Sequence, residues 1–373
     1  MNVKDFLKEI GSDFYTGVPD SQLRSLCNYV ADTYGISRQH MIAANEGNCT
    51  ALAAGYYLAT GKIPLVYMQN SGIGNIINPV ASLLNENVYG IPCVFVIGWR
   101  GEPEVPDEPQ HIFQGQISEK LLKDIGIHTI ILNKDTTIGQ LKSEMEKGKE
   151  LLKKEKAIAF LVRKKALDSD KYVEISCAYS IVREKAIKQI VEVAKEDIIV
   201  STTGKTSREL FEIRELNQQS HKYDFLTVGS MGHCSSIALG IALNKPNTKV
   251  WCIDGDGAVL MHMGAMALIG SQGPGNMIHV VMNNEAHESV GGMPTVASKI
   301  DLTKIAKGCG YENVSSVNDY EELKIQLNLA KNLHQLSFIE VKCAIGSRPD
   351  LGRPTVSPVK NKEEFMKYLK VLV

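Results

Sequence analysis

Short apolar runs rich in β-branched residues alternate along the whole chain with segments whose apolar residues recur at helical spacing. Such runs are typical of parallel strands buried on both faces, and the intervening segments are typical of the helices that connect them. The pattern predicts an α/β protein built from parallel sheets in three-layer α/β/α domains.

The alternation occurs twice, once in each half of the chain. The strands expected in the first half are 14–19, 41–45, 63–69, 92–98, 128–132 and 157–163, and those in the second half are 198–202, 225–228, 249–253, 277–282, 313–317 and 338–343. A last amphipathic helix is expected at 362–372.

A charged and polar stretch without sustained periodicity separates the two halves. We therefore expect a first α/β domain at 1–164, a linker at 165–178 and a second α/β domain at 179–373. The length of 373 residues suits two domains of ordinary size.

The charge balance argues against polyanionic partners. The 41 basic and 42 acidic residues leave a net charge of −1, so we expect neither nucleic acid nor a membrane surface as a partner. No apolar run approaches the roughly 20 residues of a membrane-spanning helix. The first ten residues carry four charges and lack the apolar core of a secretory signal, which predicts a cytoplasmic protein. The eight scattered cysteines indicate reduced thiols rather than a zinc site.

The strongest chemical signal is Gly255-Asp256-Gly257, which follows a predicted strand and opens a helix expected at 258–269. Free N–H groups at a helix start attract anions. Asp256 would repel a phosphate unless a cation lay between them, so the run predicts Mg²⁺ bridging the protein to a diphosphate.

The next predicted strand ends in Asn283-Asn284, at the same edge of a parallel sheet. Mg²⁺ is then expected to bind Asp256, the Asn284 side chain and the main-chain oxygen of Ala286, with diphosphate oxygens and water completing its shell. Each motif alone is more often a plain turn, but the two together at adjacent strand ends favour a site.

The segment 255–284 resembles the Gly-Asp-Gly to Asn-Asn motif of thiamine diphosphate enzymes. The loops 202–204 and 229–232 are similar to the cofactor-holding loops of that family. The resemblance implies that Met231 is an apolar wedge under the cofactor, although plain core packing would also suit a methionine. The implied cofactor-binding residues are Thr203, Gly204, Ser230, Met231, Gly255, Gly257, Ala258 and Asn284.

Glu46 follows the predicted strand 41–45 and begins a helix at 47–58, in a segment that looks like the family's pyrimidine-domain glutamate motif. The resemblance implies a catalytic acid beside the cofactor's pyrimidine, with a raised pKa. Compensation of the helix dipole is the plain alternative. In such enzymes the two halves of a site come from different subunits, which implies at least a homodimer with Glu46 facing a partner's Asp256 site. Two α/β halves also leave no room for the central third domain of many relatives.

Three loops rich in turn and polar residues, 17–21, 99–111 and 346–355, are candidates for substrate selection. Together with 284–295 they resemble the phosphonopyruvate decarboxylase family over nearly the whole chain. The resemblance implies conversion of 3-phosphonopyruvate, a 2-keto acid with a phosphonate group, to phosphonoacetaldehyde and CO₂ in phosphonate biosynthesis.

Other activities stay open. A sulfopyruvate decarboxylase would need a similar anion pocket, and a thiamine-dependent carboligating transferase acting on a 2-keto acid would use the same cofactor residues. A non-catalytic nucleotide-binding subunit would not need Glu46, whose presence argues against that class.

Several residues are candidates for the substrate site. Asp20 and Ser21 lie in the first selection loop, and Arg348 and Arg353 are expected to clamp a doubly charged group. Lys205 or Arg208 could assist, and surface ion pairs with Asp350 or Glu209 are the alternative. His111 is a candidate proton relay for product release, although a lone histidine in a loop is more often a surface residue.

Overall fold

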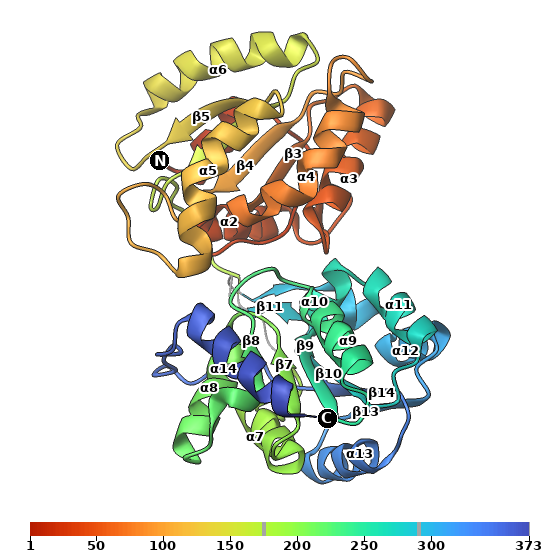
Figure 1. Ribbon diagram of the computed structural model, residues 1–373. Coiled ribbons are helices and arrows are strands. Elements are labelled where there is room, and N and C mark those ends of the chain that lie inside the picture. Colours follow the sequence, from red (N-terminus) through yellow and green to blue (C-terminus); the bar gives the residue numbers. More distant parts are fainter. Residues whose placement is uncertain (174–176, 289–291, 373) are drawn as a thin grey trace. The chain divides into compact units, whose positions relative to one another are not determined.

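The computed structural model describes residues 1–173, 177–288 and 292–372. The chain forms two compact units (Figure 1). The first comprises Met1–Ile175 and Val290–Pro294, and the second comprises Ser176–Ser289 and Thr295–Val373. Each unit contains a six-stranded parallel sheet with helices on both faces, so the predicted three-layer α/β/α architecture is confirmed.

The first sheet has the strand order β2-β1-β3-β4-β6-β5. Every residue of β4 and β6 is buried, which explains why these strands read as continuous apolar runs. The strands are β1 (Tyr15–Gly17), β2 (His40–Ile42), β3 (Leu65–Gln69), β4 (Val94–Gly98), β5 (His128–Leu132) and β6 (Ile158–Val162).

Helices cover both faces of this sheet. On one face α1 (Val3–Ile10), α2 (Arg24–Tyr34) and α6 (Ile138–Lys153) pack their apolar residues against the strands. On the other face lie α3 (Glu46–Thr60), α4 (Ile73–Pro79) and α5 (Pro109–Asp124), with the short helices η1 (Asn70–Gly72) and η2 (Val80–Leu84).

The second sheet has the order β13-β14-β10-β9-β7-β8. Read from β8, its six strands follow the same chain order as the first sheet: second, first, third, fourth, sixth, fifth. The strands are β7 (Ile198–Ser201), β8 (Asp224–Leu226), β9 (Val250–Gly255), β10 (Met277–Asn283), β13 (Asn313–Val317) and β14 (Ser337–Lys342). In both sheets the direction of winding changes between the first and third strands, where ligands of doubly wound folds bind.

The second sheet is also covered on both faces. The helices α7 (Arg183–Ala194), α8 (Lys205–Leu216) and α13 (Tyr320–Asn332) pack on one face. The other face carries α9 (Cys234–Asn244), α11 (Gly264–Gln272), α12 (Leu302–Cys309) and α14 (Pro358–Val371). The remaining elements are α10 (Asp256–Met261), η3 (His221–Tyr223), η5 (Val296–Lys299), β11 (Ala286–His287) and β12 (Met293–Pro294).

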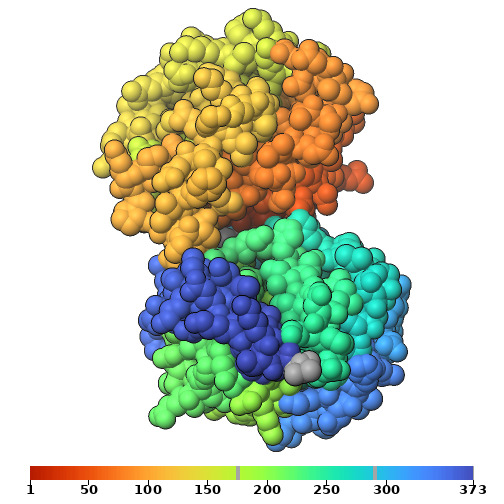
Figure 2. Space-filling view, in the orientation of Figure 1, coloured from red at the N-terminus to blue at the C-terminus, as the bar shows by residue number. Residues whose placement is uncertain are grey.

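The C-terminal helix α14 protects the β8 edge of the second sheet. The buried Asn361 side chain accepts from Leu226 N–H at 3.1 Å and donates to Asp224 O at 2.9 Å. In Figure 2 this dark-blue segment lies on the surface of the second unit. Sheet edges covered in this way cannot pair with another chain.

All twelve predicted strands are present, with ends shifted by a few residues. The prediction of a single helix at 258–269 was wrong. The segment forms two helices, because α10 ends at Met261 and α11 begins at Gly264. His262 between them leaves the helical region at φ −132°, and Gly264 is a weak helix former. The last helix begins earlier than expected because Ser357 caps it and Pro358 takes its first position.

The first residues of the expected linker are integrated into the first unit. Ala166 and Leu167 are buried, and Asp168 exchanges backbone hydrogen bonds of 2.9 Å with Met1 and Val3. Residues 174–176 of that linker lie outside the described residues. Within the described ranges, the structure has no helix with both the length and the apolar character needed to cross a bilayer.

Candidate active site

The turn from β9 to α10 carries Asp256. The residue is 3% exposed, and its Oδ2 accepts a hydrogen bond of 2.5 Å from Thr295 Oγ1. Burial raises the pKa of Asp256 to about 6, and its partners among the described residues are a hydroxyl and backbone N–H groups rather than a lysine or arginine. A buried carboxylate without a cationic partner is costly, so a divalent cation fits this position.

The end of β10 lies beside Asp256. Met282 pairs with Gly255, so Asn283 and Asn284 follow at the same edge of the sheet. Asn283 turns into the core and donates to Glu340 Oε1 at 2.7 Å, whereas Asn284 Oδ1 accepts from Ala286 N–H at 3.1 Å. Carboxylate, amide and main-chain oxygens, the ligand types that Mg²⁺ prefers, are therefore available here from Asp256, Asn284 and Ala286.

Four charged side chains behind Asn284 form what we call the Glu288 network. Glu288 Oε2 accepts from Asn284 Nδ2 at 2.9 Å and from Arg183 Nη1 at 2.6 Å, and its Oε1 accepts from Lys205 Nζ at 2.8 Å. Arg183 also donates to both oxygens of Glu209, at 2.7 and 2.8 Å. Burial alone would raise the pKa of Glu288, but Arg183 and Lys205 outweigh it and lower this pKa to about 2. The network holds the amide of Asn284 in one orientation.

Glu285 follows the Asn pair and adopts a left-handed backbone conformation, with φ +59°. Its Oε1 accepts from the Tyr179 hydroxyl at 2.6 Å and lies 3.7 Å from Lys342 Nζ. The Glu285 carboxylate, next to the predicted metal ligand Asn284, is therefore bound by Tyr179 and Lys342.

The loops after β7 and β8 are tied to each other. Thr203 Oγ1 donates to Val228 O at 2.8 Å. Gly204 precedes α8 with φ +91°, and Ser230 and Gly232 also have positive φ, at +57° and +84°. Left-handed residues let these loops turn tightly and present N–H groups at the strand ends, as a diphosphate requires.

Gly257, at the start of α10, has no side chain and lies between the side chains of Met231 and His287. A Cβ added to Gly257 would lie 3.4 Å from Met231 Cε and 3.4 Å from His287 Cε1. Met231 is partly exposed, whereas Ala258 and His287 are buried. Burial lowers the pKa of His287 to about 4, so this imidazole is neutral at pH 7. Met231 therefore lies against Gly257, next to the Asp256 turn.

In the first unit, Glu46 is the first residue of α3, which Asn45 caps by accepting from Gly47 N–H at 2.8 Å. Glu46 is 4% exposed, and its Oε2 accepts from Asn75 Nδ2 at 2.7 Å. A Cβ on Gly72 would lie only 2.5 Å from Glu46 Oε1. Burial raises the pKa of Glu46, as a proton-exchanging acid requires.

Asp20 is fully buried after β1 at the same edge of the first sheet. Its oxygens accept from Gln69 Nε2 at 2.7 Å and from Gln22 N–H at 3.2 Å, and burial raises its pKa. A Cβ on Gly98 would lie 2.0 Å from Asp20 Oδ2. Asp20 is thus an inward-facing group, and its exposed neighbour Ser21 faces a cavity.

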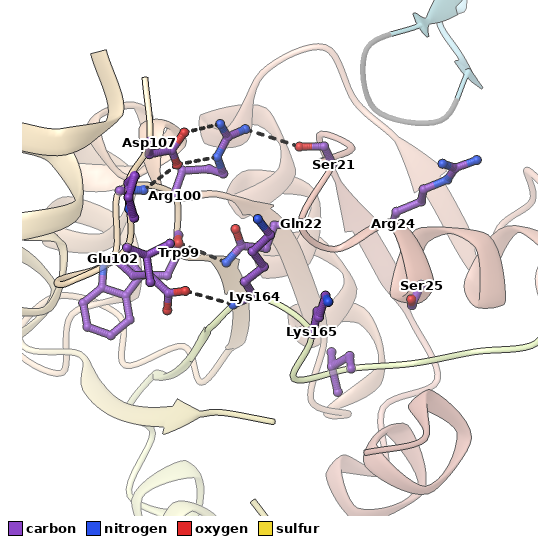
Figure 3. A pocket seen from close by; sticks show the side chains of 14 residues that line it. Ser21, Gln22, Arg24, Ser25, Trp99, Arg100, Glu102, Asp107, Lys164 and Lys165 are labelled. Atoms are coloured by element: carbon purple, nitrogen blue, oxygen red, sulfur yellow. Dashed lines mark hydrogen bonds and ion pairs between the residues drawn. The ribbon is translucent and has the colours of Figure 1, made fainter. Parts of the chain in front are cut away.

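That cavity, which we call the basic cavity, lies at the carboxyl ends of β1, β4 and β6 (Figure 3). Its volume is about 370 Å³. Arg100 crosses it, donating to Asp107 Oδ2 from Nε at 2.7 Å and lying 3.5 Å from Ser21 Oγ. It is lined by Ser21, Gln22, Arg24, Ser25, Trp99, Arg100, Gly101, Glu102, Val105, Pro106, Asp107, Lys164, Lys165 and Leu167.

His111 does not lie in a loop, as expected, but in the first turn of α5, because Pro109 starts the helix there. Its Nδ1 is buried and has no hydrogen-bond partner within the part of the chain that the structure describes. Burial, and then the charge of Arg100, lower the pKa of His111. A neutral imidazole can accept a proton, and its role as a relay stays a prediction.

The two arginines expected to clamp the substrate lie between β14 and α14 in the second unit. Arg348 pairs with Glu184 at 2.9 Å, with Asp350 at 3.1 Å and with Glu212. Arg353 is exposed. Arg348 is therefore engaged by three carboxylates, and binding a substrate there would require it to exchange partners.

The described chain groups the predicted residues into two half-sites, one on each unit. The second unit brings together the Asp256 turn, Asn284, Ala286 and the loops after β7 and β8, and the first brings Glu46, Asp20 and Ser21 to one sheet edge. Gly72, Asn75, Arg183 and Glu288 were not predicted from the sequence, because Asn75 lies 29 residues from Glu46 and Arg183 lies 105 residues from Glu288. Thr295 was inside the 284–295 loop, of which residues 289–291 lie outside the described ranges.

Comparison with known families agrees with this division. Residues 3–123 match the family described as "Thiamine pyrophosphate enzyme, N-terminal TPP binding domain". Residues 202–341 match "Thiamine pyrophosphate enzyme, C-terminal TPP binding domain". Each half of the chain thus corresponds to one half of a thiamine pyrophosphate (thiamine diphosphate) enzyme.

Curated relatives match almost the whole chain. A phosphonopyruvate decarboxylase of Streptomyces viridochromogenes is 32% identical over 97% of this chain and 93% of its own length. A sulfopyruvate decarboxylase of Methanosarcina acetivorans is 28% identical over 99% of this chain and 97% of its own length. A solved structure of a putative thiamin diphosphate-dependent enzyme from Mycobacterium smegmatis is 14% identical, with a TM-score of 0.38, and covers 91% of this chain and 98% of its own.

The matched domains correspond to the two half-sites, and the full-length relatives are decarboxylases. The chain therefore belongs to the thiamine diphosphate-dependent decarboxylases, in the family that contains the phosphonopyruvate and sulfopyruvate decarboxylases.

Proposed function

We propose that this protein decarboxylates 3-phosphonopyruvate to phosphonoacetaldehyde and CO₂ in phosphonate biosynthesis, using thiamine diphosphate and Mg²⁺. The observation that carries the choice of substrate is the 32% identity to a phosphonopyruvate decarboxylase over nearly the full length of both chains. Sulfopyruvate is the second candidate, because a sulfopyruvate decarboxylase matches 99% of the chain at 28% identity.

The residues have separate tasks in this proposal. Asp256, Asn284 and Ala286 hold Mg²⁺, and the loops around Thr203, Gly204, Ser230 and Met231 hold the cofactor with Gly255, Gly257 and Ala258. The bound cofactor supplies an electron sink for the carbon–carbon bond that breaks. Glu46, kept protonatable by burial, exchanges a proton with the cofactor's pyrimidine ring.

We also propose that the enzyme is at least a homodimer and works in the cytoplasm, with domains at 1–164 and 179–373. Glu46 and Asp256 belong to different units of the chain. The resemblance to thiamine diphosphate enzymes supports a site that takes Glu46 from one chain and Asp256 from its partner. A monomer is therefore expected to be inactive.

The substrate is tested by an assay panel. The protein, supplied with thiamine diphosphate and Mg²⁺, is given phosphonopyruvate, sulfopyruvate or pyruvate alone, and CO₂ and aldehyde are measured. The proposal expects the highest kcat/KM for phosphonopyruvate. A higher kcat/KM for sulfopyruvate would identify sulfopyruvate as the substrate instead. A product formed only with an added carbonyl acceptor would indicate a carboligating transferase.

A further inference from the structure

The basic cavity of the first unit has an excess of positive charge. Its lining carries four cationic side chains, Arg24, Arg100, Lys164 and Lys165, and two carboxylates. Clustered cations at the end of a parallel sheet attract anions and raise their local concentration.

Both carboxylates of the cavity are already paired. Asp107 accepts from Arg100 Nη2 at 2.5 Å and from Gly101 N–H at 2.8 Å. Glu102 accepts from Arg163 Nε, outside the lining, at 2.6 Å. Two of the remaining cations, Lys164 and Lys165, form no ion pair within the described ranges, so their charges are not neutralised by the protein.

The cationic groups come from three segments that converge at one edge. Arg24 begins α2, and its guanidinium lies 5.8 Å from the ring centre of Tyr172. Arg100 follows β4, while Lys164 and Lys165 form the turn after β6, closed by a 3.1 Å bond from Ala166 N–H to Arg163 O. Figure 3 shows Arg100 reaching toward the Ser21 hydroxyl, with Arg24, Ser25, Lys164 and Lys165 in the same view.

The floor of the cavity is fixed by hydrogen bonds. Gln22 Nε2 donates to Trp99 O at 3.0 Å and to Val162 O at 2.9 Å, which ties the ends of β4 and β6 together. The strand ends that precede Arg100 and Lys164 are therefore held together before a ligand binds.

We propose that the basic cavity binds the tetrahedral phosphonate dianion of the substrate, with Lys164 and Lys165 as its specificity-determining cations. This inference rests on the proposed function. In this proposal the basic cavity, and not Arg348, binds the phosphonate, because Arg348 is already paired with three carboxylates. A cavity of about 370 Å³ accommodates a three-carbon acid, and Ser21 and Ser25 supply neutral donors.

The test removes the two charges without disturbing the turn. Lys165 has φ +64°, which asparagine tolerates well, so the variant is Lys164→Gln with Lys165→Asn. The matched control is Lys153→Gln with Lys154→Gln, another exposed adjacent lysine pair of the same unit. Steady-state kinetics with phosphonopyruvate and pyruvate are combined with calorimetric binding of phosphonoacetate and of inorganic phosphate to the cofactor-free protein.

We expect the variant to raise KM for phosphonopyruvate and Kd for phosphonoacetate by at least about tenfold, with KM for pyruvate unchanged and the control like wild type. Wild-type values in the variant would overturn the proposal, and so would a loss confined to inorganic phosphate. If wild type does not turn over phosphonopyruvate but the variant loses phosphonoacetate binding, the proposed function fails while the anion site stands.

Discussion

At the scale of single residues, the proposed site depends on two buried carboxylates that must differ in protonation state. Glu46 must carry a proton to act as an acid, whereas Asp256 must be ionised to hold a cation. Burial raises the pKa of both side chains. Asp256 follows β9 beside the end of β10 and Asn284, whereas Glu46 accepts from the Asn75 amide at the start of α3, and we propose different tasks for the two carboxylates.

Replacing Glu46 by glutamine keeps the shape of the side chain and removes its proton exchange. We expect kcat to fall by roughly 10²- to 10⁴-fold, with the affinity for thiamine diphosphate within a few-fold of wild type. Cofactor titration by fluorescence together with turnover assays checks this, and wild-type turnover in the variant would contradict the assigned role.

The same substitution has a pH-dependent effect on stability. Because burial raises the pKa of Glu46 in the folded state, ionisation costs stability as pH rises through that pKa. Glu46→Gln should therefore unfold at a higher temperature than wild type at pH 7, and at a similar temperature near pH 4, around or below the ordinary carboxyl pKa. An unchanged melting temperature at both pH values would argue against a buried, ionised Glu46.

Protons should compete with Mg²⁺ for Asp256. Since burial raises the pKa of Asp256 to about 6 in the metal-free protein, the carboxylate is mostly ionised at pH 7 and mostly protonated at pH 5. We expect the Mg²⁺ affinity to fall about tenfold between these pH values. Titration of the cofactor-loaded protein with Mg²⁺ measures it, and Asp256→Asn serves as the control that lacks the pH dependence. An equal affinity of wild type at both pH values would remove Asp256 from the metal site.

At the scale of elements, the sequence revealed strands and strand ends well. Strands buried on both faces read as apolar runs, and Glu46, Asp256 and Asn284 could be found because each follows such a run at the carboxyl edge. The helix that carries His111 was missed because the turn residues before Pro109 hide its start. Gly72 and Asn75 could not be predicted, since their role depends on how η1 and α4 lie against α3.

The contact between η1 and α3 makes a sharp prediction. A Cβ at Gly72 would lie within 2.5 Å of the Glu46 carboxylate, so Gly72→Ala must displace that group. We expect kcat to fall by at least about tenfold, since a misplaced acid loses much of its contribution. Gly74→Ala is the matched control, because a Cβ there meets no atom within 4 Å. Equal activity of the two variants would show that Gly72 does not position the Glu46 carboxylate.

The Glu288 network links α7 and α8 to the residues after β10. Glu288→Gln removes one of the two carboxylates that pair with buried Arg183, and it removes the carboxylate partner of the partly exposed Lys205. We therefore expect a loss of roughly 1.5–3 kcal/mol in the free energy of unfolding. Denaturant unfolding measures this loss. The control is Glu364→Gln, which breaks a solvent-accessible pair with Lys360 and is expected to change stability by less than about 1 kcal/mol. A small effect of Glu288→Gln would show that the network does not brace Asn284.

At the scale of the whole molecule, two units share one strand order without obvious sequence similarity. Each carries a buried carboxylate at the carboxyl edge of its sheet, Glu46 on the first unit and Asp256 on the second, and we propose that these are the acid and the cation ligand. The family match assigns both units to one enzyme. The sequence predicted this division from the repeated alternation, but no local pattern indicates whether one chain or two complete an active site.

The most direct measurement is a subunit-mixing assay. Two variants expected to be inactive, Glu46→Gln and Asp256→Ala, are mixed in equal amounts, unfolded and refolded together, and the decarboxylase activity of the mixture is measured. If the acid and the metal site of one active centre come from different chains, half of the sites in a mixed dimer are intact, and about a quarter of wild-type activity should return. Recovery of that activity would support the account. No recovery, despite mixed dimers shown by mass spectrometry, would contradict it.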